Sequence, residues 1–411
     1  MDKLIKDIQN IKDNIYKIGN INNERRKNIL NDIKESIDKR RKEIIDANEI
    51  DVKNASYLSE SMIDRLKIND KRIDDIISSI DKLNELNDCV GEVIERFTTI
   101  DGLDIEKVRV PFGIICVIYE ARPNVTIDLI ALAIKTSNAC VLRGGKEAIN
   151  TNKKIIEIVK DAIKKYDIDE CIYLVEDLSH EVVNKLIKLN GLIDLVIPRG
   201  GKNLINNVVN NASVPVIETG AGNCHMYVEA SCDFDMAIKL IINGKTQRPS
   251  VCNAVESILI DDKIKDEFLP LLKSQLDKYN VIIKGCKKTK NIIDCIDAQE
   301  EDYYQEYNDL IVNIKVIDGI DAAIKHINKY STHHSDCIIT KNDDYANRFL
   351  NEIDSACVYV NASTRFTDGG CFGFGAEVGI STQKMHARGP MGIRELMSYK
   401  YKIIGQGQVR K

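Results

Sequence analysis

The chain has 411 residues, of which 44% are hydrophobic and 29% charged, a composition typical of a globular protein with more than one domain. Acidic and basic residues alternate, the formal net charge is only −5 and the sequence pI is about 5.8, so we expect no nucleic-acid partner and no membrane surface. The charged residues among the first twenty positions predict no secretory segment, and the 12 irregularly spaced cysteines predict free thiols and a cytoplasmic location.

Residues 1 to about 95 predict several amphipathic helices, because charge is abundant and apolar residues recur at helical spacing. Asn48 and Asp51, between two such stretches, suit a turn and a helix cap. We expect these helices to pack against a larger core and assign them no chemistry. One apolar stripe consists of Leu4, Ile5, Ile8, Ile11 and Ile15.

Two later segments predict projecting strands. Residues 98–110 predict a hairpin that turns at Asp101 and Gly102, and residues 396–404 predict a terminal strand. Exposed strand edges favour pairing with another subunit.

From residue 113 onward, short apolar strands alternate with helical stretches. Such alternation predicts parallel sheets covered on both faces, hence an α/β fold with two domains, the second starting near residue 236. The first domain has candidate strands at 113–119, 139–143, 171–175, 193–197 and 214–217. The second has candidate strands at 255–260, 311–317, 335–340 and 356–361, with helices at 236–243, 263–278, 319–329 and 343–352.

An Arg-Gly-Gly-Lys sequence follows two of these strands, at 143–146 and at 199–202. Glycines let the backbone approach a ligand closely, and a following helix offers free N–H groups to an anion. The pair of turns therefore predicts a site for a phosphorylated ligand, and two ordinary strand-to-helix turns with surface cations are the alternative.

Several familiar motifs are absent from the sequence. Gly220 and Gly222, like Gly373 and Gly375, lack the third glycine of a dinucleotide-binding fingerprint. No metal-binding spacing occurs, and the adjacent pair His333 and His334 is a weak signal, so no metal is predicted.

Cys252 is the most informative single residue. It lies in a loop before the strand at 255–260, where a rigid scaffold can present a thiol to a substrate. Lys245 and Arg248 are cations nearby, and cations favour the nucleophilic thiolate over the thiol. The alternative is a small buried hydrophobe, which is how we interpret the cysteines inside apolar strands: Cys116, Cys140, Cys171 and Cys337.

Long runs of the chain resemble the gamma-glutamyl phosphate reductase (glutamate-5-semialdehyde dehydrogenase) family of the aldehyde dehydrogenase superfamily. The likeness covers essentially the whole chain. The runs are VPFGIICVIYEARPNVT (110–126), LRGGKE (142–147), IPRGG (197–201), KTQRPSVCN (245–253), YVNASTRFTDGG (359–370) and ISTQKMHARGPMG (380–392).

The resemblance implies an aldehyde-dehydrogenase-like fold with two parallel-sheet α/β domains and an oligomerisation arm made of the hairpin and the C-terminal strand. Four segments follow from it. They are an NADPH-binding domain with N-terminal helices at 1–235 (including an oligomerisation hairpin at 97–112), a catalytic domain at 236–362, a return to the cofactor domain at 363–395, and the arm at 396–411.

The implied activity is the NADPH-dependent reduction of L-glutamyl 5-phosphate to L-glutamate 5-semialdehyde with release of phosphate, in proline biosynthesis. Cys252 would form the thioester, and Asn124 would stabilise the oxyanion together with the Cys252 N–H. Glu218 matches the glutamate that activates water in hydrolytic relatives, but phosphate is the acyl partner here, so we expect it to orient the thiol or the cofactor.

For the cofactor, the resemblance places the nicotinamide ribose at Glu306. The two glycine turns are the expected site for a phosphorylated ligand, and charge favours NADPH because Arg143 and Lys146 supply the cations that a 2′-phosphate requires. These cofactor candidates are Arg143, Gly144, Gly145, Lys146, Gly200, Gly201 and Glu306.

The substrate carries a carboxylate and a phosphate, for which Arg365 and Arg388 are the candidate partners, with His334 and His386 as weaker ones. For each arginine, a structural ion pair is an equal alternative. As partners we expect a second copy of the chain, in a dimer or tetramer, and a glutamate 5-kinase that supplies the acyl phosphate.

Three other functions stay open from the sequence. One is a hydrolytic NAD-dependent aldehyde dehydrogenase with Glu218 as base, which would not require phosphate. Another is a thiol hydrolase that pairs Cys252 with His225, and it would be active without nicotinamide. A non-catalytic assembly protein is the third, and it would tolerate loss of the thiol.

Overall fold

The computed structural model of the chain describes residues 3–120 and 122–410, without the side chains of residues 60 and 61. The chain forms two compact units, each with its own sheet. Unit 1 consists of Met1–Glu218, Gly373–Gly379 and Met391–Lys411. Unit 2 consists of Thr219–Phe372 and Ile380–Pro390.

Unit 1 is built on a four-stranded parallel sheet with the order β5-β4-β3-β6. Its central strand β3 is buried along its whole length, which explains the continuous apolar run there. The direction of winding reverses between β3 and β6, so the carboxyl ends of these two strands form the switch point where α/β folds bind ligands. The strands are β3 (Ile114–Tyr119), β4 (Ala139–Arg143), β5 (Ile172–Leu174) and β6 (Leu195–Arg199).

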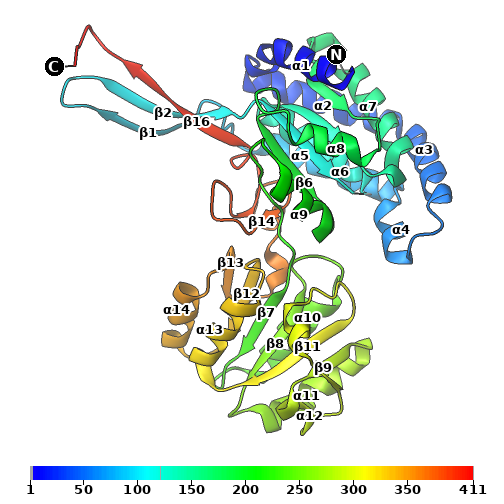
Figure 1. The fold of residues 1–411 in the computed structure, drawn as a ribbon, viewed down its shortest axis with the longest axis vertical. Helices are drawn as coiled ribbons and strands as arrows, with labels where there is room; N and C mark the ends of the chain where they lie inside the picture. Colours follow the sequence, from blue (N-terminus) through cyan, green and yellow to red (C-terminus); the bar gives the residue numbers. More distant parts are fainter. Residues whose placement is uncertain (1–2, 121, 411) are drawn as a thin grey trace. The chain divides into compact units, whose positions relative to one another are not determined.

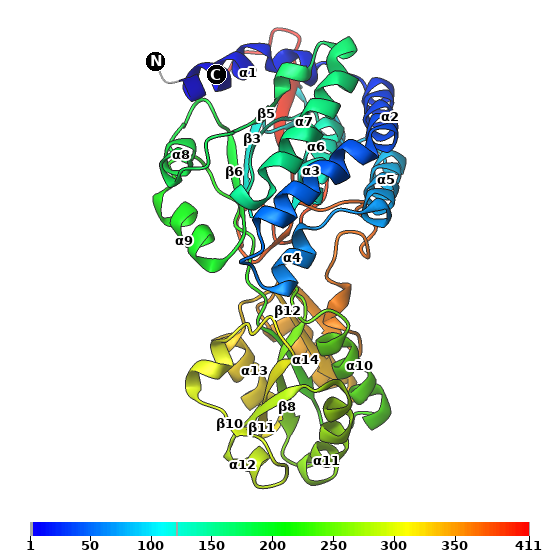
Figure 2. The same cartoon turned by 90° about the vertical axis from the view of Figure 1, so that its right-hand side faces the viewer.

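Helices α2, α3, α5, α6 and α7 of unit 1 gather together, apart from α8 and α9 (Figure 2). The N-terminal helices pack onto the crossover helices α6 and α7, as expected from their apolar stripes. The bounds are α1 (Lys3–Gly19), α2 (Asn23–Lys39), α3 (Arg41–Asn54), α4 (Glu60–Leu66), α5 (Asp70–Glu85), α6 (Pro123–Lys135), α7 (Ile149–Ile163), α8 (His180–Leu186) and α9 (Lys202–Asn211).

The prediction of a turn at Asn48 and Asp51 is wrong, because both residues lie inside α3 and are buried. The carboxylate of Asp51 accepts hydrogen bonds from the backbone N–H (2.8 Å) and hydroxyl of Thr151, so it caps the start of α7 from another helix. The Asn48 side chain bonds the backbone N–H of Ile68 at 2.6 Å and the carbonyl of Leu66. Both polar residues are thus satisfied by tertiary contacts.

The predicted hairpin and terminal strand are confirmed as a three-stranded antiparallel sheet with the order β1-β2-β16. Its strands run side by side away from the helices of unit 1 (Figure 1). The bounds are β1 (Val93–Thr98), β2 (Asp104–Pro111) and β16 (Met397–Ile404). This sheet, named the arm here, exposes large apolar side chains at Phe97, Ile100, Tyr399, Tyr401, Ile403 and Ile404.

Unit 2 is built on a seven-stranded parallel sheet with the order β10-β9-β11-β8-β7-β12-β13. Strands β7, β8 and β12 are fully buried, and Phe268 and Phe349 are among the largest buried side chains on the covering helices. The strands are β7 (Cys224–Val228), β8 (Val255–Asp261), β9 (Ile282–Gly285), β10 (Ile296–Asp297), β11 (Ile311–Ile317), β12 (Ser335–Ile339) and β13 (Cys357–Val360).

The helices of unit 2 follow the predicted alternation, with α10 longer than expected at its C-terminal end. They are α10 (Phe234–Thr246), α11 (Lys265–Leu276), α12 (Lys287–Lys290), α13 (Gly319–Tyr330) and α14 (Asp343–Glu352). A two-stranded antiparallel sheet joins β14 (Ile380–Ser381) to β15 (Gly389–Pro390). Short 3-10 helices are η1 (Lys146–Ala148), η2 (Lys164–Tyr166), η3 (Asp169–Cys171), η4 (Asp277–Tyr279), η5 (Glu300–Tyr304) and η6 (Thr364–Phe366).

The unit boundaries differ from the expected ones at 235/236 and at 362/363. Unit 2 already begins at Thr219, because β7 pairs with β8 and β12 of the second sheet. The segment 363–395 is also shared between the units: 380–390 stays with unit 2, where the carbonyl of Ile380 accepts a hydrogen bond from Gly220 (2.9 Å). The strand expected at 214–217 is only an isolated bridge from Val216 to Val196 on β6.

The architecture confirms the predicted fold class: two parallel-sheet α/β units with an antiparallel arm. The four cysteines assigned to the core, Cys116, Cys140, Cys171 and Cys337, are all buried. Among the described residues, none of the helices combines the length and the apolar character needed to cross a bilayer.

Candidate active site

The first glycine turn of unit 1 follows β4 and leads into η1. A Cβ on Gly144 would lie 2.4 Å from the Asn152 amide and 3.3 Å from the Tyr119 ring, so only glycine fits there. The guanidinium of Arg143 is half-buried and donates to the carbonyls of Gly144 (3.0 Å) and Leu178 (2.6 Å). Burial lowers the pKa of Arg143.

Lys146 provides the accessible charge of this turn. It is exposed, and its ammonium lies 5.7 Å from the ring centroid of Tyr57. The turn therefore has two buried glycines, with Gly144 packed closely against Asn152 and Tyr119, next to one solvent-facing cation at Lys146.

In the second glycine turn, at 199–202, the carboxylate of Glu120 occupies the position where the sequence predicted a bound anion. Gly201 is the N-cap of α9, and its N–H donates to Oε1 of Glu120 at 3.0 Å. A Cβ on Gly200 would also meet the Glu120 side chain, at 2.6 Å. Helix N-termini attract negative charge, and Glu120 supplies it here. A cofactor phosphate would have to displace this side chain.

Asn124 lies in the first turn of α6, which follows the carboxyl end of β3. Its side-chain amide hydrogen-bonds the carboxylate of Asp128, one turn later. Burial raises the pKa of Asp128 to about 6, while the charge of Arg199 and the Asn124 bond oppose that rise. The amide predicted to serve an oxyanion is thus oriented by a carboxylate that the sequence argument did not identify.

Cys252 is half-buried in the turn between α10 and β8, as predicted. The segments that precede β7, β8 and β12 all meet at the amino ends of these parallel neighbours. The N–H of Asn223, before β7, donates to the Thr332 hydroxyl before β12 at 2.9 Å. The Cys252 thiol therefore lies at the amino ends of the strands of its own sheet.

The backbone of Cys252 is packed closely against the segment before β7. A Cβ on Gly222 would lie 2.6 Å from the Cys252 Cα and would overlap its carbonyl group. The carbonyl oxygen of Cys252 accepts a hydrogen bond from the Cys224 thiol at 3.2 Å. The N–H of Gly222 donates to Glu306 at 2.8 Å. Glu306, predicted to hold a ribose, thus contacts the segment that supports the thiol.

Arg365 lies beside this loop on η6. Its Nε donates to the Gln247 side chain at 3.1 Å, and Nη1 donates to the side chain of Asn253. Burial and the neighbouring charge of Arg248 lower the pKa of Arg365, whereas Cys252 raises it. Arg248 is exposed, and no hydrogen bond or ion pair connects it to another described residue. Two guanidinium groups therefore accompany the thiol.

Lys245 does not provide the cation that the sequence predicted near Cys252. Because α10 continues to Thr246, Lys245 points into the core and forms an ion pair with Glu256 on β8. The Nζ–Oε2 distance is 2.6 Å and both side chains are 0% exposed. Burial raises the pKa of Glu256 and lowers that of Lys245, while the attraction between the two groups opposes both shifts.

The remaining predicted substrate residues are placed less favourably. His334 is fully buried, with Nδ1 2.9 Å from the Ser335 hydroxyl, and burial lowers its pKa to about 4. Arg388 is paired with Asp354 at 2.8 Å, the structural ion pair that the sequence left as an alternative. His334 is thus enclosed, whereas Arg388 is exposed with one of its guanidinium nitrogens, Nη2, bonded to Asp354.

Glu218 is half-buried at the end of unit 1, and its role remains a prediction. The alternative catalytic histidine, His225, is fully buried on β7. Its Nδ1 lies 3.0 Å from the carbonyl of Asn223. That position does not favour a thiol hydrolase.

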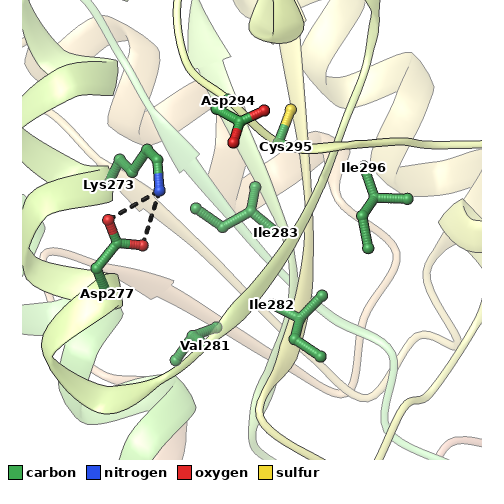
Figure 3. Close-up of a pocket in the computed structure, with 8 residues that line it drawn as sticks. All are labelled: Lys273, Asp277, Val281, Ile282, Ile283, Asp294, Cys295 and Ile296. Atoms are coloured by element: carbon green, nitrogen blue, oxygen red, sulfur yellow. Dashed lines mark hydrogen bonds and ion pairs between the residues drawn. The ribbon is translucent and has the colours of Figure 1, made fainter.

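A hollow of about 250 Å³ lies beside the edge strand β10 of unit 2 and its neighbour β9 (Figure 3). None of the predicted site residues lines it. Its walls are Lys273, Asp277, Val281, Ile282, Ile283, Asp294, Cys295 and Ile296. Over the described residues, no group of three or more His, Cys, Asp or Glu side chains is arranged to hold a metal ion.

Several residues that shape the site were not predicted from the sequence: Glu120, Asp128, Gly222, Cys224, Asn253 and Glu256. Gly222 did give a signal as part of a glycine pair, but it was compared only with the dinucleotide fingerprint. Asn253 follows the thiol directly. Its side-chain amide donates to the Thr367 carbonyl at 2.8 Å.

Comparison with known proteins places this geometry in a family. The aldehyde dehydrogenase family model matches residues 3–313. The gamma-glutamyl phosphate reductase of Thermotoga maritima is 48% identical over 100% of both chains, and that of Clostridium acetobutylicum is 53% identical over 90% of this chain and 89% of its own.

Solved structures agree with these relatives. The crystal structure of gamma-glutamyl phosphate reductase from Thermotoga maritima matches with a TM-score of 0.97 at 48% identity, covering 100% of each chain. An acetylating aldehyde dehydrogenase from Geobacillus thermoglucosidasius, 14% identical, matches with a TM-score of 0.71 over 100% of this chain and 99% of its own. The second likeness is one of fold alone.

Proposed function

Because this chain is an oxidoreductase that belongs to the aldehyde dehydrogenase family, among the gamma-glutamyl phosphate reductases, we propose that it reduces L-glutamyl 5-phosphate to L-glutamate 5-semialdehyde with NADPH and releases phosphate, a step of proline biosynthesis. The observation that carries the proposal is the half-buried Cys252 on a tightly held loop, accompanied by two guanidinium groups.

In the first step, the Cys252 thiolate attacks the acyl carbon of the substrate. A carbon–sulfur bond forms, the bond from that carbon to the phosphate oxygen breaks, and phosphate leaves with the electron pair, so a thioester remains. Arg365 and Arg248 support this step, because paired guanidinium groups favour a thiolate and bind an anionic phosphate.

Two tetrahedral adducts occur on Cys252, one before the thioester and one after its reduction. Each carries an oxyanion on the former carbonyl oxygen of the substrate. The backbone N–H of Cys252 is the donor on the loop itself, and the peptide that carries it is held because its carbonyl, that of Val251, accepts a hydrogen bond from the N–H of Ala254 at 3.0 Å. The Asn124 amide is the second proposed donor. In the present arrangement it bonds Asp128, so it must be shared with or released from that carboxylate to serve the oxyanion.

NADPH, when bound, would supply a hydride to the thioester carbon. The carbon–sulfur bond of the resulting Cys252 adduct then breaks, which releases the aldehyde and regenerates the Cys252 thiolate. Lys146 is the exposed cation suited to a 2′-phosphate. Arg143 is already engaged with two carbonyls, so we expect it to shape the turn more than to bind the phosphate.

A hydrolytic aldehyde dehydrogenase that uses Glu218 as base is the second candidate, favoured by the match to that family alone. The two differ in their acyl acceptor. In the oxidative direction, the proposed enzyme turns over only with phosphate, whereas the hydrolytic enzyme uses water.

For partners, we propose that the arm pairs with a second copy of the chain. Its strands β1 and β16 form open edges, and Ile100 at its tip is fully exposed. A glutamate 5-kinase that delivers the acyl phosphate stays a prediction from the family resemblance.

The proposal is tested by following NADP⁺ reduction with glutamate semialdehyde, with and without phosphate. We expect phosphate-dependent turnover, and Cys252→Ala should reduce kcat by about 10³-fold or more because the covalent step is lost. Cys295→Ala, which removes another half-buried thiol of unit 2, is the matched control and should keep full activity. The proposed function would be refuted by a turnover rate that is the same with and without phosphate, or by a Cys252→Ala variant that keeps the wild-type turnover rate.

A further inference from the structure

A buried ion pair lies beneath the Cys252 loop and is not used by the chemistry described above. Lys245, in the last turn of α10, and Glu256, the second residue of β8, are 0% exposed and 2.6 Å apart. The thiol loop at 247–254 connects the two elements that carry them. The pair therefore joins the two ends of this loop directly.

A contribution to folding stability does not by itself explain a buried ion pair at this position. Burial removes both charges from water, and apolar residues of similar volume often serve a core as well or better. Within the described chain, Glu256 is the one hydrogen-bond partner of the Lys245 ammonium. An ion pair of this kind does fix one separation and one direction, which apolar packing specifies less strictly.

Glu256 also connects the loop to the segment that carries Glu306. Its Oε1 accepts the backbone N–H of Asn308 at 3.3 Å, and Asn308 has a left-handed backbone, with φ of 57°. Two residues earlier, Glu306 accepts the N–H of Gly222, and Gly222 packs against the backbone of Cys252. Glu256 is therefore connected to the backbone of Cys252 in a second way, through the 306–308 segment and Gly222.

We propose that Lys245 and Glu256 are positioning residues for the nucleophile. The ion pair holds the end of α10, the start of β8 and the 306–308 segment at fixed separations, and so keeps the Cys252 thiol and N–H in the geometry for attack. The inference rests on the proposed function only in taking Cys252 as the nucleophile.

The test compares full-length variants by three measurements. The first is the melting temperature, and the second is kcat, with KM for glutamate semialdehyde, in phosphate-dependent NADP⁺ reduction. The third is the rate at which iodoacetamide alkylates Cys252, followed by peptide mapping. The main variant is Lys245→Met with Glu256→Met, which keeps volume and removes both charges. The control is Lys273→Gln with Asp277→Asn, which removes an exposed ion pair of the same unit (Figure 3).

We expect the double methionine variant to melt within a few degrees of the wild type, with kcat reduced at least tenfold, KM within twofold, and alkylation of Cys252 changed at least threefold. The control should match the wild type in all three. A folded variant with wild-type kcat and alkylation overturns the proposal. So does a lower kcat with wild-type alkylation, because the thiol would then be unaffected.

If the double variant does not fold, Lys245→Arg decides the question, since it keeps the charge and changes the length of the side chain. We expect changed kcat and alkylation in the folded Lys245→Arg protein, and wild-type values overturn the proposal. Failure of the proposed function is separate: the wild-type chain would show no phosphate-dependent turnover, while the alkylation comparison would still test the positioning role.

Discussion

Substitution of Gly222 by alanine tests how closely the Cys252 loop is held. The alanine Cβ would lie 2.6 Å from the Cys252 Cα and would overlap its carbonyl group. The nearest carbon, that of the Cys252 carbonyl group, would be 2.2 Å away. Carbon atoms in contact are about 3.5–4.0 Å apart, so the two backbones must separate by roughly 1–2 Å. The neighbouring bonds from Cys224 to the Cys252 carbonyl and from Gly222 to Glu306 would be strained in the same movement.

The expected loss follows from this displacement. A misplacement of about 1 Å can cost on the order of 10²-fold in rate, whereas overpacking usually costs about 1–3 kcal/mol of stability. We therefore expect Gly222→Ala to remain folded with a lowered melting temperature and to lose about 10²-fold in kcat.

The assay measures kcat for phosphate-dependent NADP⁺ reduction, alkylation of Cys252 and the melting temperature on the same preparations. Gly19→Ala is the matched control, because a Cβ there would meet nothing within 4 Å. It should behave like the wild type. If Gly222→Ala retained wild-type kcat and alkylation while folded, the loop would tolerate the shift and the reasoning would fail.

Three further predictions concern single side chains. Lys146→Ala should reduce the preference for NADPH over NADH by about tenfold, and addition of Arg143→Ala should change it little further, as measured by kcat/KM for each cofactor. Arg365→Lys, which cannot bridge Gln247 and Asn253 in the same way, should slow both turnover and alkylation of Cys252. Folding lowers the pKa of His334 from 6.5 to about 4, so between these pH values the unfolded chain binds more protons than the folded chain. The contribution of His334 to the free energy of unfolding is therefore retained above pH 6.5 and is lost as the pH decreases toward 4. Urea unfolding of the wild type should therefore lose about 2 kcal/mol from this group between pH 7 and pH 5, and an equal loss in His334→Asn would contradict the assignment.

The fold was largely predictable because apolar periodicity is a local property. Continuous apolar runs placed β3, β4, β8, β11 and β12 within a residue or two of their observed bounds. β7 was missed, since Cys224–Val228 follows a glycine-rich segment and has no helical stretch before it. The unit boundary moved to residue 218 for the same reason.

The thiol loop was predicted from the residues between a helix and a strand, and Cys252 lies there. What the sequence left undecided was the direction of each charged side chain. Lys245 was predicted to lie near the thiol, but one additional turn of α10 points it at Glu256, while Gly244 packs against Val255.

The sequence alone therefore determined which segments form the two sheets, and it located the nucleophile in the connection before β8, because hydrophobic spacing and loop composition act over neighbouring residues. Only the tertiary structure decided which polar groups meet. Asp51 caps α7, Glu120 bonds the start of α9 and Glu256 holds Lys245. Each partner comes from a different element, and the pairing depends on how those elements pack, which spacing along the chain does not specify.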